Sequence, residues 1–414
     1  MAELILDAVT KRFAQTPVVN EVSLKIEPGT FVALLGPSGC GKTTVLRMIA
    51  GFERVDAGRI LLDGQVLSSA QHYTPPEQRQ MSMVFQSYAL WPHMNVADNI
   101  GYALKLKKIS GRAYEDQVNE ALEAVNMQGL AKRMPSELSG GQRQRVALAR
   151  CLVSAPKVVL LDEPLANLDQ HLRASMEQTF REFHQRTGAI FIYVTHDQAE
   201  AMALADKIAV MHQGKIVQYD TPENLYRQPE TEWTARFIGQ GSILYSTTEP
   251  VRSEPASYLR GDQACITSEY EHDECVTGLS EKQAHESTEQ EPYYQEICLN
   301  KKQSYALTEP EPVRSERELV GTELMAMLKV AASPSSYTHS ILVRPQHIRV
   351  IAHDSVESKH SLHATIRERS FKGERYHYQA DVLGNQTIAF YNEHKIAIGE
   401  SVQLLLERGY LLRG

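Results

Sequence analysis

The run Gly36-Pro37-Ser38-Gly39-Cys40-Gly41-Lys42-Thr43 has the spacing G-x-x-x-x-G-K-[ST], which can bind a polyphosphate. Glycines in such a loop let backbone N–H groups turn toward phosphate oxygens, Lys42 neutralises the terminal oxygens, and Thr43 offers a hydroxyl to Mg2+. The run follows FVALL and precedes KTTVLRMIA, so a strand should lead into it and a helix should leave it. We predict a phosphate site at residues 36–43, and we include Thr44, the next residue of the helix.

Two acidic residues follow an apolar run in KVVLLDE, at residues 157–163. Carboxylates at the end of a buried strand can hold Mg2+ through water and polarise an attacking water, roles that we give to Asp162 and Glu163 respectively. Two acids after an apolar run are more often a solvated strand end. The phosphate loop upstream favours the functional interpretation.

A second phosphate-binding segment is predicted at Leu138-Ser139-Gly140-Gly141-Gln142, directly before the helical pattern RQRVALARCLV. The N-terminus of a helix leaves backbone N–H groups without intrahelical partners, and the Ser139 hydroxyl adds another donor. We call residues 138–142 the signature segment.

The order of the phosphate loop, LSGGQ, LLDEP and THD resembles the nucleotide-binding domain of ABC transporters, and the resemblance covers residues 1 to about 240. It implies ATP and Mg2+ as the bound groups. In that family two domains face each other head to tail, so that each ATP lies between one phosphate loop and the partner's signature segment. One copy of each motif per chain therefore implies a homodimer, or a heterodimer with a close relative.

The same resemblance implies roles for three isolated residues. Phe13 would stack on adenine, Gln86 would bridge Mg2+ and the permease contact, and His196 would touch the γ-phosphate. The predicted catalytic residues are thus Glu163, His196 and Gln86, and the predicted metal ligands are Thr43, Gln86 and Asp162. A single Phe usually lies in the core, a single Gln usually lies on the surface, and a single His usually has a structural role. Only the family-like order and spacing of the three residues favour functional roles.

One departure from the family pattern lies in the loop that signals across the dimer. Asn167-Leu168-Asp169 matches that loop, but Ala166 stands where relatives usually have serine. One hydroxyl contact across the interface is therefore in question, and we expect hydrolysis to be preserved.

Short β-branched runs alternate with helical patterns from Leu4 to about Gly239, which predicts an α/β fold with a largely parallel sheet. Strand signals vanish over residues 87–156, where helical periodicity in 112–127 and 141–155 predicts an inserted helical subdomain. Alternating runs return from Ser340 onward and predict a small all-β, OB-like domain. The predicted domains are 1–240, 241–339 and 340–414.

The middle segment differs from its neighbours in composition. Residues 249–318 contain sixteen acidic and seven basic residues, a balance of −9 against −8 for the whole chain, and EPVRSE occurs at both 249–254 and 311–316. An acidic sequence with an internal repeat of this kind is typical of a weakly constrained linker. We expect an acidic, flexible insertion, or else a divergent first half of the C-terminal regulatory domain.

QSYALWPHMNVADNIGYALKL and LVRPQHI resemble importers with an appended OB-type (TOBE) regulatory domain. That resemblance implies permease subunits and an extracytoplasmic solute-binding protein as partners, and a peripheral place on the cytoplasmic face of the inner membrane. Trp91, His93 and Met94 would contact the permease, or else belong to the subdomain core. The sequence of the helical subdomain resembles that of ferric-iron importers, which favours ferric iron as cargo. Polyamine, phosphonate or another small solute are the alternatives.

Composition argues against several other classes. The net charge of −8 argues against nucleic-acid binding, and no apolar run reaches the roughly 18 residues of a spanning helix. The acidic start MAELILD does not resemble a signal peptide. Cys265, His272, Cys275, His285 and Cys298 lack the paired spacing of zinc sites. A soluble non-transport ABC ATPase and an exporter subunit remain the rival functions.

Overall fold

The computed structural model describes residues 2–166, 170–246, 318–328, 339–351, 361–384 and 386–412. The chain divides into one compact unit of Met1–Pro250 with Arg317–Gly414, and a second unit, Val251–Glu316. All of the second unit lies outside the described residues, as does nearly all of the acidic segment 249–318.

The centre of the N-terminal part is a six-stranded sheet in the order β10-β9-β3-β8-β7-β6, and only the β10–β9 pair is antiparallel. Its strands are β3 (Phe31–Leu35), β6 (Met81–Val84), β7 (Val158–Asp162), β8 (Ile190–Thr195), β9 (Lys207–His212) and β10 (Lys215–Asp220). β3 is buried along its whole length because both faces of the sheet are covered. The predicted α/β class with a largely parallel sheet is confirmed.

A second, antiparallel sheet was not identified from the sequence. It has the order β2-β1-β4-β5 and consists of β1 (Leu4–Phe13), β2 (Thr16–Ile26), β4 (Ala57–Leu62) and β5 (Gln65–Ser69). Its apolar side packs with α1 (Lys42–Ala50) and one face of the parallel sheet in a single core, to which β3 contributes Val32 and Leu34. Phe31 and Ala33 point into the core on the opposite face.

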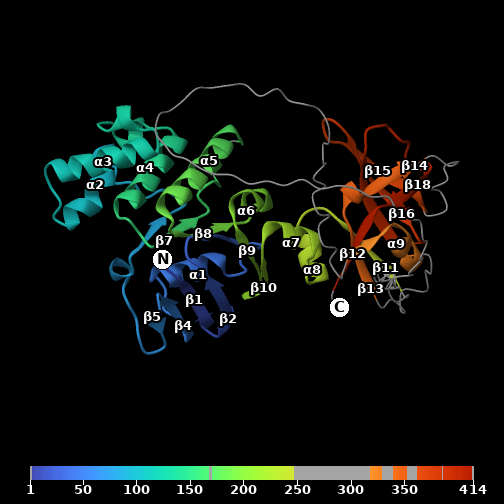
Figure 1. Ribbon diagram of the computed structural model, residues 1–414, viewed down its shortest axis with the longest axis horizontal. Coiled ribbons are helices and arrows are strands. Elements are labelled where there is room, and N and C mark those ends of the chain that lie inside the picture. The colour runs from blue at the N-terminus through green and yellow to red at the C-terminus, as the bar shows by residue number, and fades with distance from the viewer. Residues whose placement is uncertain are drawn as a thin grey trace, which may run out of the picture. The chain divides into compact units, whose positions relative to one another are not determined.

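Helices cover that opposite face (Figure 1). They are α2 (Val96–Leu106), α3 (Arg112–Ala124), α4 (Gly140–Val153), α5 (Gln170–Thr187) and α6 (Gln198–Leu204), with short 3-10 turns at Pro76–Gln78, Gln128–Leu130 and Pro135–Glu137. α2, α3 and α4 pack on one another and form the predicted helical subdomain between β6 and β7. α7 (Pro222–Arg227) and α8 (Glu232–Phe237) follow the sheet.

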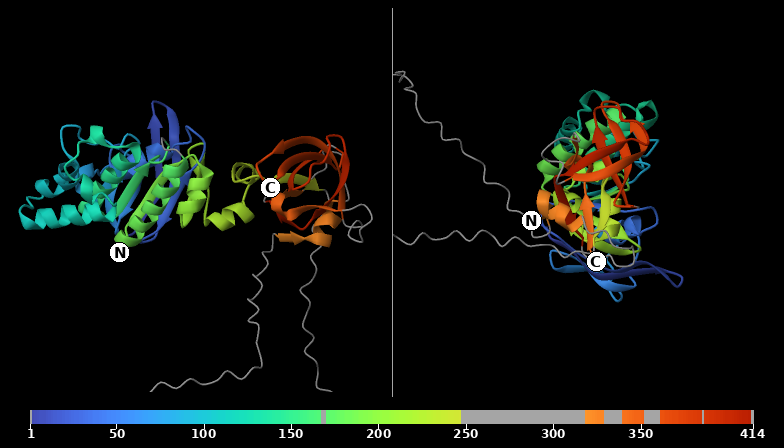
Figure 2. Two further views of the ribbon diagram at one scale, coloured as in Figure 1. Left: turned by 90° about the horizontal axis from the view of Figure 1, so that it is seen from above. Right: turned by 90° about the vertical axis from the view of Figure 1, so that its right-hand side faces the viewer.

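The C-terminal part is built mainly from antiparallel strands that curve around a shared apolar interior (Figure 2). One sheet has the order β11-β13-β19-β12 and the other β14-β18-β15-β16-β17. The strands are β11 (Ser242–Ser246), β12 (Glu318–Val320), β13 (His339–Val343), β14 (Ile348–Ile351), β15 (Ser361–Phe371), β16 (Tyr376–Val382), β17 (Gln386–Asn392), β18 (Ser401–Leu406) and β19 (Arg408–Leu411). This half-barrel confirms the predicted OB-like C-terminal fold.

Elements on both sides of the acidic segment take part in that C-terminal core. β11 pairs with β13, β12 pairs with β19, and α9 (Gly321–Leu328) contributes Leu324, Met325, Met327 and Leu328 to the apolar interior. The core of the β-domain therefore includes residues that precede Ser340.

No helix among the described residues is long and apolar enough to cross a membrane.

Candidate functional site

Four loops that the sequence predicted to be functional leave the same edge of the parallel sheet. β3, β8, β7 and β6 run parallel, so their carboxyl ends meet at one edge. The phosphate loop follows Leu35, His196 follows Thr195, Glu163 follows Asp162, and Gln86 lies two residues beyond Val84. Ligands of open parallel sheets bind at this edge.

Two glycines allow the phosphate loop to fit against its surroundings. A Cβ at Gly36 would lie 2.3 Å from the Met211 carbonyl oxygen, and one at Gly41 would lie 2.7 Å from the Val18 carbonyl oxygen. Gly41 also has a φ of 106°, which disfavours any residue with a side chain. The loop therefore needs glycine at these positions before any ligand is considered.

Lys42 opens α1 and folds back over the loop. Its ammonium group donates to the carbonyl oxygens of Gly36, at 2.8 Å, and Pro37, at 3.0 Å, and the residue is only 6% exposed. Cys40 Sγ lies 3.9 Å from the Lys42 Nζ atom, and burial raises the pKa of the Cys40 thiol despite the nearby ammonium. Ser38 and Gly39 are exposed at the tip of the loop, while Thr44 is half-buried in the first turn of α1.

Thr43 and Asp162 form the part of the site that suits a divalent cation. The Thr43 hydroxyl donates to Asp162 Oδ1 at 3.4 Å. Partial burial is the main reason why the pKa of the Asp162 carboxyl is raised, and the bond from Thr43 opposes that shift. A bound cation would offset the cost of burying this carboxylate, and hydroxyl and carboxylate oxygens are the ligands that Mg2+ prefers.

Glu163 and His196 approach each other from neighbouring strands. The Glu163 backbone N–H donates to the Val194 carbonyl at 3.1 Å, and Glu163 Oε1 lies 3.3 Å from His196 Nδ1. The two side chains are 26% and 57% exposed respectively, so both can be reached by water and ligand. This pair of a carboxylate and an imidazole beside the phosphate loop can orient and deprotonate a water molecule.

The signature segment begins α4. Ser139 Oγ accepts a hydrogen bond from the Gln142 N–H, and Gln142 Oε1 accepts one from the Ser139 N–H, so the two residues form a capping box. Ser139 is exposed, Gly140 is half-buried, and Gly141 is buried. The N-terminus of α4 thus presents the Ser139–Gly140 backbone to solvent.

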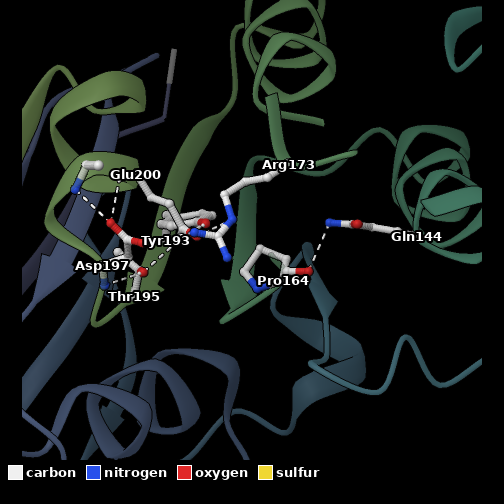
Figure 3. Close-up of polar contacts among 8 residues, drawn as sticks. Gln144, Pro164, Arg173, Tyr193, Thr195, Asp197 and Glu200 are labelled. Carbon is white, nitrogen blue, oxygen red and sulfur yellow. Dashed lines mark hydrogen bonds and ion pairs between the residues drawn. The ribbon is translucent and has the colours of Figure 1, made fainter. Parts of the chain in front are cut away.

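No sequence pattern predicted that Gln144 ties α4 to the loop after β7. Gln144 is fully buried, and its side-chain amide donates to the Pro164 carbonyl at 3.0 Å, as Figure 3 shows. Pro164 directly follows Glu163, so the helix of the signature segment is hydrogen-bonded to the loop of the predicted base.

The structure keeps the remaining predicted residues near the surface. Phe13 is 47% exposed at the end of β1, with Lys11 Nζ 5.4 Å from its ring centroid. Gln86 and His93 are exposed, and Met94 is half-buried. Trp91 is half-buried between Tyr102, with ring centroids 4.3 Å apart, and the Arg150 guanidinium at 5.1 Å.

Two of the sequence predictions fall where the structure gives no description. Ala166 is described and exposed, but Asn167, Leu168 and Asp169 lie outside the described residues. The cysteines and histidines between Cys265 and Cys298 are also outside them. No cluster of three or more His, Cys, Asp or Glu side chains suited to a metal occurs in the described part of the chain.

A partly buried polar cluster, which includes both sequence neighbours of His196, was not predicted. It contains Arg173, Tyr193, Thr195, Asp197 and Glu200 (Figure 3). The one available signal was the pattern D-x-x-E directly after a strand, at Asp197 and Glu200, which is typical of a helix N-terminus. Arg173, on a separate helix, could not be linked to it by sequence spacing.

Comparison with known proteins gives two family matches. Residues 19–166 match the family described as ABC transporter, and residues 341–411 match the TOBE domain. Among solved structures, cbiO1 from Clostridium perfringens, described as part of the ABC transporter complex cbiONQ, has a TM-score of 0.50 and 26% identity. The match covers 54% of this chain and 90% of that one.

Two curated relatives are similar over longer stretches. The spermidine/putrescine import ATP-binding protein PotA of Chromobacterium violaceum is 47% identical over 286 residues, which cover 68% of this chain and 76% of the relative. The Fe(3+) ions import ATP-binding protein FbpC of Pasteurella multocida is 48% identical over 246 residues, which cover 59% and 69% respectively. Both relatives are named as import ATP-binding proteins. This chain therefore belongs to the ATPase subunits of ABC importers for small solutes that carry a C-terminal TOBE domain.

Proposed function

We propose that this chain hydrolyses Mg2+-bound ATP as a homodimer and thereby drives the import of ferric iron through a membrane permease. The observation that supports this most is the meeting of the phosphate loop, Asp162, Glu163 and His196 at one edge of the parallel sheet.

In this proposal, backbone groups of residues 36–44 and the Lys42 ammonium bind the phosphates, and Phe13 stacks on the adenine. Thr43, Asp162 and Gln86 hold Mg2+, which neutralises phosphate charge. Glu163 accepts the proton of the attacking water, while His196 contacts the γ-phosphate. The 3.3 Å approach of Glu163 Oε1 and His196 Nδ1 supports the assignment of both residues to one reaction centre.

The dimer is proposed from the position of the signature segment. The hydrogen bonds described for Ser139 and Gln142 lie within their own helix end, which leaves the N-terminus of α4 open to a second molecule. A helix N-terminus favours a phosphate. We therefore place residues 139–142 against the ATP held by the partner's phosphate loop.

The remaining partners follow from the importer class. We propose a solute-binding protein outside the membrane, the permease within it, and this chain bound peripherally at the cytoplasmic face. Nucleic acid is not among the proposed partners, because the chain has a net charge of −8.

For the domains we propose an ATPase domain over 1–240 with the helical subdomain at about 87–156, a segment 241–339, and the TOBE domain over 340–414. Packing of β11, β12 and α9 into the C-terminal core supports assigning the two ends of segment 241–339 to the regulatory domain.

The loop at Trp91 and His93 is the proposed permease contact. Asn99 is fully buried and hydrogen-bonds to both the N–H and the carbonyl of Trp91, while Arg150 donates to the carbonyls of Tyr88 and Ala89. These bonds hold the loop backbone, and His93 remains exposed. A rigid loop with exposed side chains suits docking, because little conformational entropy is lost on binding.

A photoreactive amino acid at His93 is therefore expected to cross-link to the permease in membranes that contain the assembled importer. The same group at Glu27, which is exposed beyond β2, serves as the control and is expected to give no product. The measurement is the cross-linked band on a gel probed for both proteins. Full transport after alanine replacement of Trp91, His93 and Met94 together would exclude this contact.

Cargo is tested in proteoliposomes that contain the permease, this chain and the binding protein encoded with them. ATP-dependent uptake of radiolabelled ferric iron is expected, with ATP hydrolysis stimulated only when iron is loaded on the binding protein. The relative named for spermidine and putrescine makes polyamine the second candidate. Uptake of labelled putrescine or spermidine without iron uptake would replace the first proposal by the second and leave the ATPase assignment intact.

A further inference from the structure

Thr195 and Asp197, the residues on either side of His196, are held by hydrogen bonds at the start of α6. Asp197 Oδ1 accepts hydrogen bonds from the N–H groups of Ala199, at 2.8 Å, and Glu200, at 3.3 Å, and so caps the helix. The Asp197 N–H in turn donates to Thr195 Oγ1 at 3.0 Å. The backbone path through His196 is therefore determined by how Thr195 and Asp197 are held.

Glu200 holds Thr195 from within the core. The Thr195 and Tyr193 hydroxyls both donate to Glu200 Oε2 at 2.7 Å, and the glutamate residue is only 4% exposed. Burial, followed by the nearby Glu200 carboxylate, raises the pKa of Tyr193, which keeps this phenol a donor. A buried carboxylate is costly unless a cation accompanies its hydrogen bonds.

Arg173 supplies that cation from another helix. From α5, its guanidinium donates to Asp197 Oδ2 at 3.0 Å, and its Nε atom lies 3.6 Å from Glu200 Oε1. Figure 3 shows the side chain extending from its helix toward Asp197 and Glu200. Glu177, on the same helix, adds further negative charge near Glu200. Its pKa is raised mainly by burial and secondly by repulsion from the Glu200 carboxylate.

We propose that Arg173 is a positioning residue for His196, because it joins α5 to both carboxylates that fix the loop around the histidine. This inference rests on the proposed ATP hydrolysis and deepens it. α5 begins at Gln170, directly after the Asn167-Leu168-Asp169 sequence that resembles the dimer-signalling loop. We call the contacts of Arg173 with Asp197 and Glu200 the clamp. The clamp links α5 to the loop of His196, the residue that contacts the γ-phosphate in the proposed function.

The test compares steady-state ATP hydrolysis by the full-length wild type, Arg173→Ala and Arg173→Lys. Arg173→Ala is expected to lower kcat about 10- to 100-fold, because small displacements of a catalytic group have effects of that size. The KM for ATP is expected to stay within about threefold, since the phosphate loop is untouched. Lysine keeps the charge but not the forked geometry, so its kcat is expected to lie between that of Arg173→Ala and that of the wild type.

Arg181→Ala is the matched control. Arg181 lies on the same helix and donates to the Ala203 carbonyl on α6, but it pairs with neither Asp197 nor Glu200 in the described structure. It is expected to keep kcat within about twofold, as surface substitutions usually have small effects.

A double-mutant cycle with His196→Ala separates positioning from a general structural role. If Arg173 acts through His196, Arg173→Ala should lower kcat by less than about twofold in the His196→Ala background. Full additivity of the two losses would overturn the proposal. If Arg173→Ala does not fold, the same cycle is run with Arg173→Lys and decides by the same criterion.

The outcomes also separate this inference from the proposed function. Hydrolysis by the wild type that is abolished by Glu163→Gln, together with an unaffected Arg173→Ala, would reject the clamp alone. A wild type without ATPase activity in the presence of its permease would reject both.

Discussion

Glu163→Gln is expected to reduce ATP turnover by about 10²- to 10⁴-fold, the range that general-base catalysis contributes. The amide cannot accept the proton of the attacking water or polarise it. Glutamine has the same shape and can still hydrogen-bond to His196, whose Nδ1 lies 3.3 Å from the present carboxylate. ATP affinity is expected to remain, because Lys42 and the loop glycines are unchanged.

The measurement is kcat by phosphate release, with ATP affinity measured separately by displacement of a fluorescent nucleotide. Glu77→Gln, at an exposed glutamate of the 3-10 turn Pro76–Gln78, makes the same chemical change away from the site. It is expected to hydrolyse ATP like the wild type. Near-normal turnover by Glu163→Gln would remove Glu163 from the role of base.

Gly140→Asp is expected to abolish cooperative hydrolysis by placing a carboxylate against the γ-phosphate that the partner subunit holds. Like charges brought together at an interface cost several kcal/mol, so the loss should reach about 100-fold or more. The substitution should not harm folding, because Gly140 does not have a positive φ and an acidic residue is favourable in the first turn of a helix.

Gly140→Asn is the matched control, since it has nearly the same volume without the charge, and it is expected to keep much more activity than Gly140→Asp. Dimer formation with ATP is measured by light scattering, and nucleotide affinity is measured at concentrations where the chain is monomeric. Affinity of the monomer should be unchanged in Gly140→Asp. Its loss there would argue that residues 139–142 act on the nucleotide of their own chain and not on that of the partner.

The sequence alone predicted those features whose physical cause lies within one short segment. The apolar run of residues 31–35 predicts a buried strand, and the loop glycines predict a tight turn, because these properties depend on neighbours along the chain. The helical patterns at 112–127 and 141–155 correspond to α3 (Arg112–Ala124) and α4 (Gly140–Val153). Family and fold class follow from motifs of this kind.

Features that form between segments far apart in the sequence were not predicted. The antiparallel sheet of β1, β2, β4 and β5 was not identified, because its pairing joins residues on both sides of the phosphate loop and α1. The C-terminal core likewise joins β11 with strands on the far side of the acidic segment. Composition identified the acidic segment, but it did not predict that the residues flanking this segment belong to the β-domain.

The chemical groups of the reaction centre can be identified from local sequence alone: a phosphate loop, a strand-end pair of acids and a histidine. Tertiary structure decided that these groups meet, because parallel pairing brings the ends of β3, β7 and β8 to one edge. It also decided what holds them. Arg173 and Glu200 are 27 positions apart in the sequence, and Gln144 and Pro164 are 20 apart. Such contacts depend on helix packing against the sheet, and no periodicity in the sequence encodes them.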